Sequence, residues 1–74
     1  MATRSARKDL LRKILKDARI SAGMRQVDVA SKLKVPQSYI AKIEQGERKV
    51  TFIEVLDLCR VLGIDAKELV SRLD

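Results

Sequence analysis

Residues 26–48 read QVDVASKLKVPQSYIAKIEQGER, and this stretch decides the fold. Its apolar residues recur at the spacing of one helix face over 26–33 and again over 37–45. Pro36 suits the start of the second helix, where its missing N–H costs nothing, and Gly46 suits a left-handed helix end. The stretch therefore predicts two short helices joined by a turn of three or four residues, which is a helix-turn-helix layout.

The outer side of the helix over 37–45 carries groups that suit a nucleic acid. On a helical wheel with about 100° per residue, Ile40 and Ile43 fall on the inner side. The outer arc holds two amides, a hydroxyl, an ammonium and one small apolar residue, namely Gln37, Ser38, Ala41, Lys42 and Gln45. Amides can pair with adenine and ammonium groups with guanine in the major groove of DNA. The same arrangement is also typical of an ordinary solvent-exposed helix face. The helical wheel alone therefore does not distinguish a DNA-contacting face from a solvated one.

The flanking segments also read as helices. Upstream, apolar residues from Leu11 to Ala22 follow a helical pattern that ends before Gly23. Downstream, Thr51 and Glu54 form a capping-box signature. The helix that it begins has an apolar stripe of Phe52, Val55, Leu56, Cys59 and Leu62. A similar box over 65–68 begins a short last helix, whose apolar residues are Leu69, Val70 and Leu73.

The predicted fold is all-α, a compact bundle of about five short helices that contains the helix-turn-helix. No alternation typical of strands and no internal repeat interrupts this pattern. We expect residues 1–4 to form a flexible tail and residues 5–74 to form a single domain. A core this small supplies only a few kcal/mol of net stability, which favours a second stabilising source such as dimerisation.

The stretch from Gln26 to Arg48 resembles the Cro/C1-type (XRE-family) helix-turn-helix, which reads approximately Q-x-x-L-A-x-x-x-G-V-S-x-S-x-I-S-x-I-E-x-G. The similarity extends upstream through Arg19 and downstream to Leu69, and it covers roughly three quarters of the chain. As a set these positions are far more specific than any single dipeptide among them. The resemblance implies a lambda-repressor-like DNA-binding domain, as in stand-alone phage repressors and restriction–modification controller proteins.

The resemblance also implies a role for each matching side chain. Bases would be contacted by Gln37, Ser38 and Lys42, with Ala41 close by. Backbone phosphates would be contacted by Gln26, Gln45, Arg48, Lys49 and, less specifically, Arg25. Arg19 and Glu44 match a pair that forms an internal salt bridge in the family, so we interpret them as structural.

Three positions depart from the family pattern. Lys34 stands where the family usually has Gly, and a left-handed lysine there costs roughly 1 kcal/mol. Pro36 replaces the usual Ser or Thr before the second helix, and Arg25 replaces Thr or Ser before the first. Each of these two replacements removes a side-chain cap.

The composition excludes several classes of function. One Cys and no His leave no internal disulfide, no zinc set and no His-dependent catalysis, so we expect no enzyme, metal or cofactor. No apolar run approaches the roughly 20 residues of a membrane helix, and none follows the basic N-terminus as in a secretory signal. We therefore expect a cytoplasmic, nucleoid-associated protein with no membrane partner and no evident small-molecule substrate.

The charge is uneven. The 74 residues hold 16 Lys and Arg against 10 Asp and Glu, a formal net charge of +6, and all of the excess lies in residues 1–26. A polyanion partner explains this asymmetry, and a solvated basic helix face explains it equally well. RNA is the weaker choice of polyanion, because only Tyr39 and Phe52 are available for stacking on bases.

Apolar residues beyond the needs of a small core indicate a partner surface on the last two helices. The candidates are Ile53, Val61, Ile64, Val70 and Leu73. We expect a homodimer that presents two reading helices to a palindromic operator in double-stranded DNA, as a transcriptional regulator. The alternative is a protein-interaction module, such as the antitoxin half of a toxin–antitoxin complex that also regulates its own synthesis. Scattered exposed aliphatic residues are the third, uninformative explanation.

Overall fold

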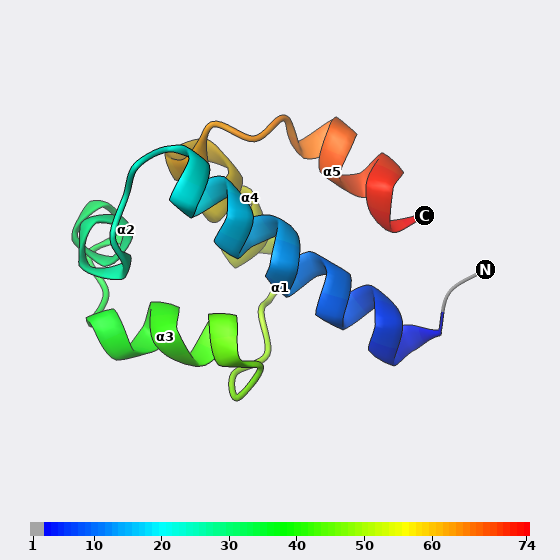
Figure 1. Ribbon diagram of the computed structural model, residues 1–74, viewed down its shortest axis with the longest axis horizontal. Helices are drawn as coiled ribbons and strands as arrows, with labels where there is room; N and C mark the ends of the chain where they lie inside the picture. Colours follow the sequence, from blue (N-terminus) through cyan, green and yellow to red (C-terminus); the bar gives the residue numbers. More distant parts are fainter. Residues whose placement is uncertain (1–2) are drawn as a thin grey trace.

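Helices form most of the chain. The computed structural model describes residues 3–74, and over that part of the chain it contains five helices and no strand (Figure 1). They are α1 (Arg4–Ser21), α2 (Gln26–Leu33), α3 (Gln37–Gln45), α4 (Phe52–Leu62) and α5 (Ala66–Leu73). The principal extents are 35 × 24 × 21 Å. The all-α prediction is confirmed.

The first helix begins earlier than the sequence predicted. The hydroxyl of Thr3 accepts a hydrogen bond from the backbone N–H of Ala6 over 3.1 Å and so caps α1. Arg4 is already helical, so the expected tail over 1–4 is wrong at these two positions, and residues 1–2 lie outside the described residues. The first helical turn carries no apolar periodicity, which is why the pattern alone did not reveal it. A hydroxyl cap is sufficient because it supplies a partner for a free N–H group.

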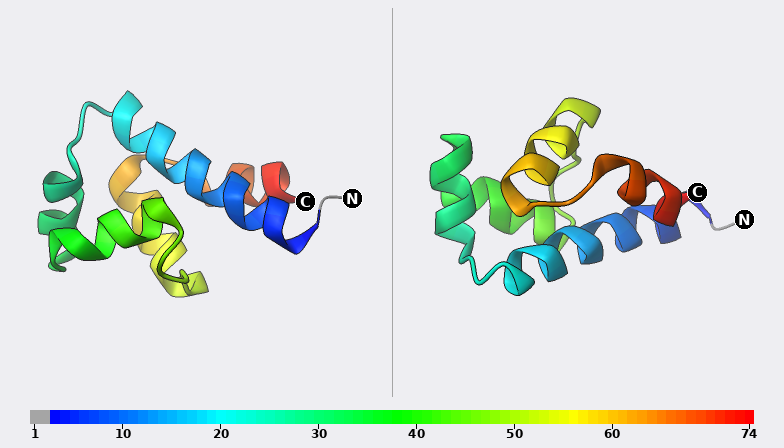
Figure 2. Two further views of the ribbon diagram at one scale, coloured as in Figure 1. Left: turned by 60° about the horizontal axis from the view of Figure 1, so that its bottom comes forward. Right: turned by 90° about the horizontal axis from the view of Figure 1, so that it is seen from above.

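The longest helix, α1, is the element against which the others pack. It contacts α3, α4 and α5, while α2 contacts α3 and α4. Figure 2 shows α2 and α3 together at the end of the molecule that lies away from both chain termini. The helix-turn-helix is therefore held from behind by α1 and α4, and its outer side is left open.

Two groups of buried side chains hold this arrangement. The larger group joins α1, α2, α3 and α4 and consists of Leu15, Val29, Ala30, Ile40, Ile43, Leu58 and Leu62. The smaller group joins α1, α4 and α5 and consists of Ile14, Cys59 and Leu69. Ala30 is 2% exposed at the crossing of α2 and α3, where a small side chain allows the close approach. Val35 in the turn packs against the larger group.

The first turn of α4 differs from the predicted stripe. Phe52, expected in the core, is 68% exposed, and Val70 of α5 is 58% exposed. The buried residues of α4 are Leu58, Cys59 and Leu62, because its N-terminal end projects beyond the core (Figure 2). The spacing of apolar residues identified the correct face of α4. It did not show that only the C-terminal half of this face is covered by the other helices.

Side-chain caps fix where the last two helices begin. The Thr51 hydroxyl accepts from the N–H of Glu54 over 3.2 Å, and the Glu54 carboxylate accepts from the N–H of Thr51 over 2.8 Å. This is the predicted capping box. Asp65 caps α5 by accepting from the N–H of Lys67 over 2.9 Å.

The turn between α2 and α3 contains a left-handed lysine. Lys34 has φ 60° and ψ 44°, and it is the one residue other than glycine with positive φ in the described chain. Its N–H and that of Val35 close α2 by donating to the carbonyls of Ser31 and Ala30. The turn thus keeps the backbone conformation for which the family uses glycine, at the expense of strain.

We expect Lys34→Gly to raise the free energy of unfolding by about 0.5–1 kcal/mol. Relief of the left-handed conformation contributes roughly 1–2 kcal/mol, and the freer unfolded chain of a glycine offsets about 0.4–1 kcal/mol of it. Urea denaturation measures the change. The matched control Lys32→Gly removes the same side chain from inside α2 and should destabilise by about 1 kcal/mol. Equal effects at the two positions would contradict the strain argument.

Candidate nucleic-acid interface

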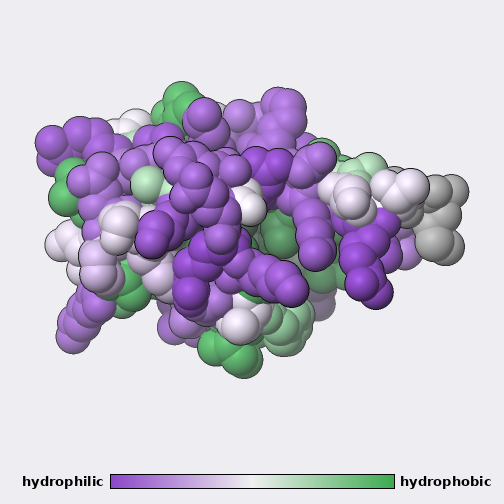
Figure 3. Space-filling view, turned by 90° about the horizontal axis from the view of Figure 1, so that it is seen from below, coloured by the Kyte–Doolittle hydropathy of each residue, from purple (hydrophilic) through white to green (hydrophobic). Residues whose placement is uncertain are grey.

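The outer face of α3 is polar and open to solvent. Ile40 and Ile43 are 3% and 2% exposed and fix the inner side of the helix. Opposite them the structure brings together the exposed side chains of Gln37, Ser38, Lys42 and Gln45, with Ala41 half-buried among them. Figure 3 looks onto the side of the molecule that carries α3, and most of that surface is hydrophilic. The predicted base-reading residues therefore share one accessible face, as the helical wheel required.

A buried ion pair ties this helix to α1. Arg19 donates from Nε to Oε2 of Glu44 over 2.7 Å and from Nη2 to Oε1 over 3.0 Å. The remaining Nη1 donates to the carbonyl of Met24 over 2.9 Å. The side chains are 13% and 7% exposed, so this bidentate pair is largely removed from water. The structural role that the resemblance implied for these residues agrees with their position behind the reading face.

Gln26 extends the same network toward the reading face. Its amide nitrogen donates to Oε1 of Glu44 over 3.0 Å, and its amide oxygen accepts from the amide nitrogen of Gln37 over 3.4 Å. One carboxylate on α3 thereby holds the first residue of α2, and that residue holds the first residue of α3. The amide of Gln37, although exposed, is thereby hydrogen-bonded to α2.

Arg12 holds the far end of α3, a role that the sequence analysis missed. Its Nη1 donates to the backbone carbonyl of Glu44 over 3.3 Å, and its guanidinium also pairs with Asp9. A positive charge at a helix C-terminus interacts favourably with the free carbonyls there. The sequence did contain a signal for this role. Arg12 and Arg19 are seven residues apart, so both lie on the side of α1 that faces α3.

Gly46 is left-handed, with φ 80°, and ends α3. The nearest atoms of the Arg12 guanidinium lie 3.0–3.1 Å from the place that a Cβ would take at this glycine. A side chain there would strain the backbone and also displace the arginine.

Arg48 does not extend freely toward a phosphate in this structure. Its guanidinium lies 4.4 Å from the centre of the Tyr39 ring, and its Nη2 donates to Oε2 of Glu54 over 2.5 Å. The Tyr39 hydroxyl donates to the same carboxylate. In this structure the exposed side chain of Arg48 bridges α3 and the beginning of α4, and the phosphate contact predicted for it stays a prediction. Sequence spacing could not show the bridge, because the three residues meet only through the loop.

This bridge has a clear electrostatic signature at its carboxylate. Hydrogen bonds to Glu54 from the backbone N–H of Thr51, then from Tyr39 and Arg48, lower its pKa from 4.5 to about 2. The carboxylate is thus ionised at every pH at which the protein is expected to work. It is the common acceptor that fixes the loop after α3.

The remaining predicted phosphate contacts are exposed. Gln45 and Lys49 are exposed at and after the end of α3. Arg25 is exposed but pairs with Asp28, from Nη2 to Oδ1 over 3.0 Å, and its backbone N–H donates to the same carboxylate. Side-chain and backbone hydrogen bonds from Arg25 lower the pKa of Asp28. The carboxylate thus supplies the N3 half of a capping box, while α2 has no side-chain cap from its N-cap residue Arg25.

Other kinds of site have little support in residues 3–74. Within that range no group of His, Cys, Asp and Glu could hold a metal ion. Cys59 is a buried free thiol whose pKa is raised by desolvation. No helix in the described part of the chain is both long enough and apolar enough to span a membrane.

The structure has two helices joined by a short turn, a polar and accessible face on the second helix, and a partly buried charge network behind it. These features define a DNA-binding helix-turn-helix domain. The profile of the family described as Helix-turn-helix matches residues 15–69. The chain belongs to this family, in its Cro/C1-type (XRE) branch.

Solved structures agree with this assignment. An XRE-family like protein from Pseudomonas syringae pv. tomato str. DC3000 is 40% identical, with a TM-score of 0.89 over 93% of this chain and 84% of that one. The wild-type restriction-modification controller protein C.Esp1396I is 24% identical, with a TM-score of 0.81 over 90% of this chain and 88% of that one. The second likeness is one of fold. No match was found among the curated proteins.

The low pKa of Glu54 predicts a steep loss of stability in acid. Because the pKa is lower in the folded state than in the unfolded chain, the stabilisation is present above about pH 4.5 and is lost as the pH falls toward about 2. Melting temperatures measured from pH 5 to pH 2 should therefore fall less steeply for Glu54→Gln than for the unmodified chain. Glu47→Gln, which removes an exposed carboxylate from the same loop, is the control. Parallel curves for Glu54→Gln and the unmodified chain would refute the bridge.

Proposed function

We propose that this chain is a transcriptional regulator that recognises a specific site in double-stranded DNA with α3 in the major groove. The observation that carries the proposal is the polar face of α3, accessible on its outer side and held by charged hydrogen bonds on its inner side. Pre-oriented side chains lose less conformational entropy on binding, which favours discrimination between bases. Family membership supports the same conclusion.

The proposed base contacts come from the first two turns of α3. Gln37 would bond adenine through both groups of its amide, Lys42 would donate to guanine, and Ser38 would bond either base. Ala41 lies between these residues in the arc and leaves room for the methyl group of a thymine. Each good bidentate contact discriminates against the wrong base by about 1–3 kcal/mol.

The proposed phosphate contacts lie on both sides of the reading helix. Gln26 and Arg25 lie at the beginning of α2, Gln45 is the last residue of α3, and Lys49 lies in the loop that follows it. Such contacts fix the register of the helix in the groove without reading sequence. Binding to Gln26 would act directly on Gln37, since their amides are hydrogen-bonded.

We propose further that the functional unit is a homodimer formed through α4 and α5. Among the predicted interface residues, Ile53 is 64% and Val70 58% exposed, whereas Val61, Ile64 and Leu73 are half-buried and pack on the chain's own core. Phe52 adds exposed apolar area beside Ile53. A two-fold dimer would read a palindromic operator with half-sites about 34 Å, or a multiple of that, apart.

The second candidate is a subunit of a protein complex, such as an antitoxin that regulates its own synthesis. The same exposed pair at the beginning of α4 favours it, because a different chain could cover this area. The two candidates differ in the state of the purified protein, and the second does not exclude DNA binding.

Selection of binding sites from a pool of random duplexes tests sequence recognition. On the selected duplex, Gln37→Ala and Lys42→Ala should weaken binding about 10- to 100-fold, in line with about 1–3 kcal/mol for each lost contact. On a random duplex Gln37→Ala should change little, because only phosphates are contacted there. Fluorescence anisotropy at a fixed salt concentration measures both.

Two controls make this test specific. Lys67→Ala removes an exposed lysine from α5 and should leave the preference for the selected site unchanged. Lys49→Gln should weaken binding to both duplexes by a similar factor, as expected for a phosphate contact. Failure of the selection to enrich any site would refute sequence-specific recognition. A footprint upstream of the chain's own coding region would identify the operator directly.

Sedimentation tests the dimer. We expect the unmodified chain to sediment as a dimer and the double variant Phe52→Ser, Ile53→Ser to sediment as a monomer that still folds, because both side chains are largely exposed. The monomer should lose affinity for a two-half-site duplex. A monomeric unmodified chain that binds a hydrophobic dye would overturn the homodimer and favour the complex with another chain.

A further inference from the structure

The N-terminal part of α1 lies outside the region that the family profile matches. The match begins at residue 15, whereas α1 begins at Arg4. The helix has 18 residues and is therefore about 27 Å long, and more than half of it precedes the match. Figure 1 shows this part of α1 extending beyond the end of α3 toward the side where the chain begins. The profile match therefore does not describe it, although the two solved structures, which cover 93% and 90% of this chain, include most of it.

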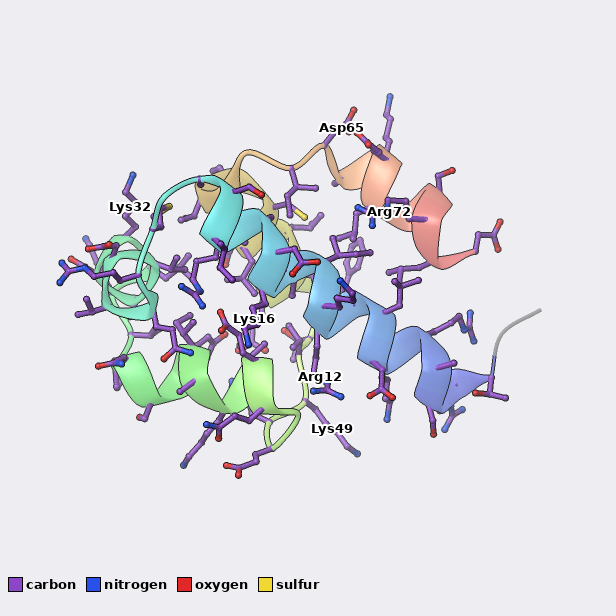
Figure 4. The ribbon with its side chains drawn as sticks, in the orientation of Figure 1. Arg12, Lys16, Lys32, Lys49, Asp65 and Arg72 are labelled. Carbon is purple, nitrogen blue, oxygen red and sulfur yellow. The ribbon has the colours of Figure 1, made fainter. Side chains whose placement is uncertain are left out.

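One side of this extension is positively charged and adjoins the end of α3. Lys8, Arg12 and Lys16 are four residues apart, so they follow one side of α1. That side adjoins α3, because Arg12 donates to the carbonyl of Glu44. Figure 4 shows Arg12 on the side of α1 that faces the loop after α3, Lys49 extending outward from that loop, and Lys16 one turn further along α1.

A groove of about 450 Å³ connects α1 with this loop. Lys8 and Arg12 line it from α1, and the loop over 46–50 lines it with Gly46 and Lys49 among others. Two carboxylates also line it, Asp9, which is already paired with Arg12, and Glu47. Lys8 and Lys16, which we call the flanking lysines, form no ion pair in the described part of the chain, and neither does Lys49, whose phosphate contact is already proposed above.

We infer that the flanking lysines form a second DNA-contact surface, which binds backbone phosphates beyond the half-site that α3 reads. The inference rests on the proposed function, since it requires α3 to lie in a major groove. Lys49 continues the line of charge from the end of α3, and Lys8 and Lys16 are about 12 Å apart along α1. One strand carries a phosphate per 3.4 Å of duplex axis, so this span suits several phosphates of one strand.

The chemistry of the extension favours a polyanion over other partners. Residues 3–9 are all exposed and include no large apolar side chain, so they offer nothing to insert into a membrane or a protein core. Four cations of α1 lack a carboxylate partner within residues 3–74, namely Arg4, Arg7, Lys8 and Lys16. Two of them lie on the side that adjoins α3, where the duplex would be.

Salt dependence tests the inference. Each phosphate contact contributes about −0.9 to the slope of log K against log salt concentration on duplex DNA. The double variant Lys8→Gln, Lys16→Gln should therefore have a slope about 1.8 less negative for each bound chain, with an unchanged preference for the selected site. The matched control is Lys32→Gln, Lys67→Gln, which removes equal charge from α2 and α5 and should keep the original slope. Figure 4 shows Lys32 pointing away from α3.

Duplex length provides an independent measurement. Removing the base pairs that flank the half-site should weaken DNA binding by the unmodified chain. It should not weaken binding by the Lys8→Gln, Lys16→Gln variant any further, because the shorter duplex and the substitutions remove the same contacts. An unchanged slope in that variant would overturn the inference, and so would an equal reduction in the control. The slopes can also be measured on a random duplex. A failure of sequence-specific binding would therefore be distinguished from a failure of the second surface.

Discussion

The structure depends on one carboxylate. Glu44 accepts from Arg19 of α1 and from Gln26 of α2 while it belongs to α3, so three helices are joined by a single partly buried carboxylate. The attraction within such a pair only slightly exceeds the free energy that its desolvation costs. Its main effect is to exclude other orientations of the three helices. An apolar contact would tolerate a small rotation of α3, whereas a bidentate ion pair fixes its angle. The orientation of the reading face follows from that constraint.

The two ends of α3 are held by different chemistry. At its beginning, Gln37 is bonded to Gln26, and at its end Arg12 donates to the carbonyl of Glu44. A third contact joins Tyr39 to Glu54, so the helix is also linked to α4. All of these groups face away from the outer arc or lie at its edge. The helix is thus fixed without using Ser38, Lys42 or Gln45, and those side chains stay exposed to solvent.

Local signals were sufficient for the helices and for the face of α3. The spacing of Ile40 and Ile43, the capping box at Thr51 and the glycine after α3 are properties of a few neighbouring residues. The ion pair came from the resemblance to a family, not from spacing. The contacts of Arg48 and Arg12 and the exposure of Phe52 depend on how separate elements meet, which local patterns do not encode. The helix also begins within the stretch that was predicted to be a tail, because the Thr3 hydroxyl caps α1.

The contact between Arg12 and Gly46 has a consequence for the evolution of this chain. The guanidinium occupies the space that any side chain at 46 would need. The two positions are therefore expected to change together, so that relatives with a larger residue after the reading helix carry a shorter one at the position of Arg12. In that case the N-terminal part of α1 and the end of α3 form one inherited unit, although 34 positions separate the two residues in sequence.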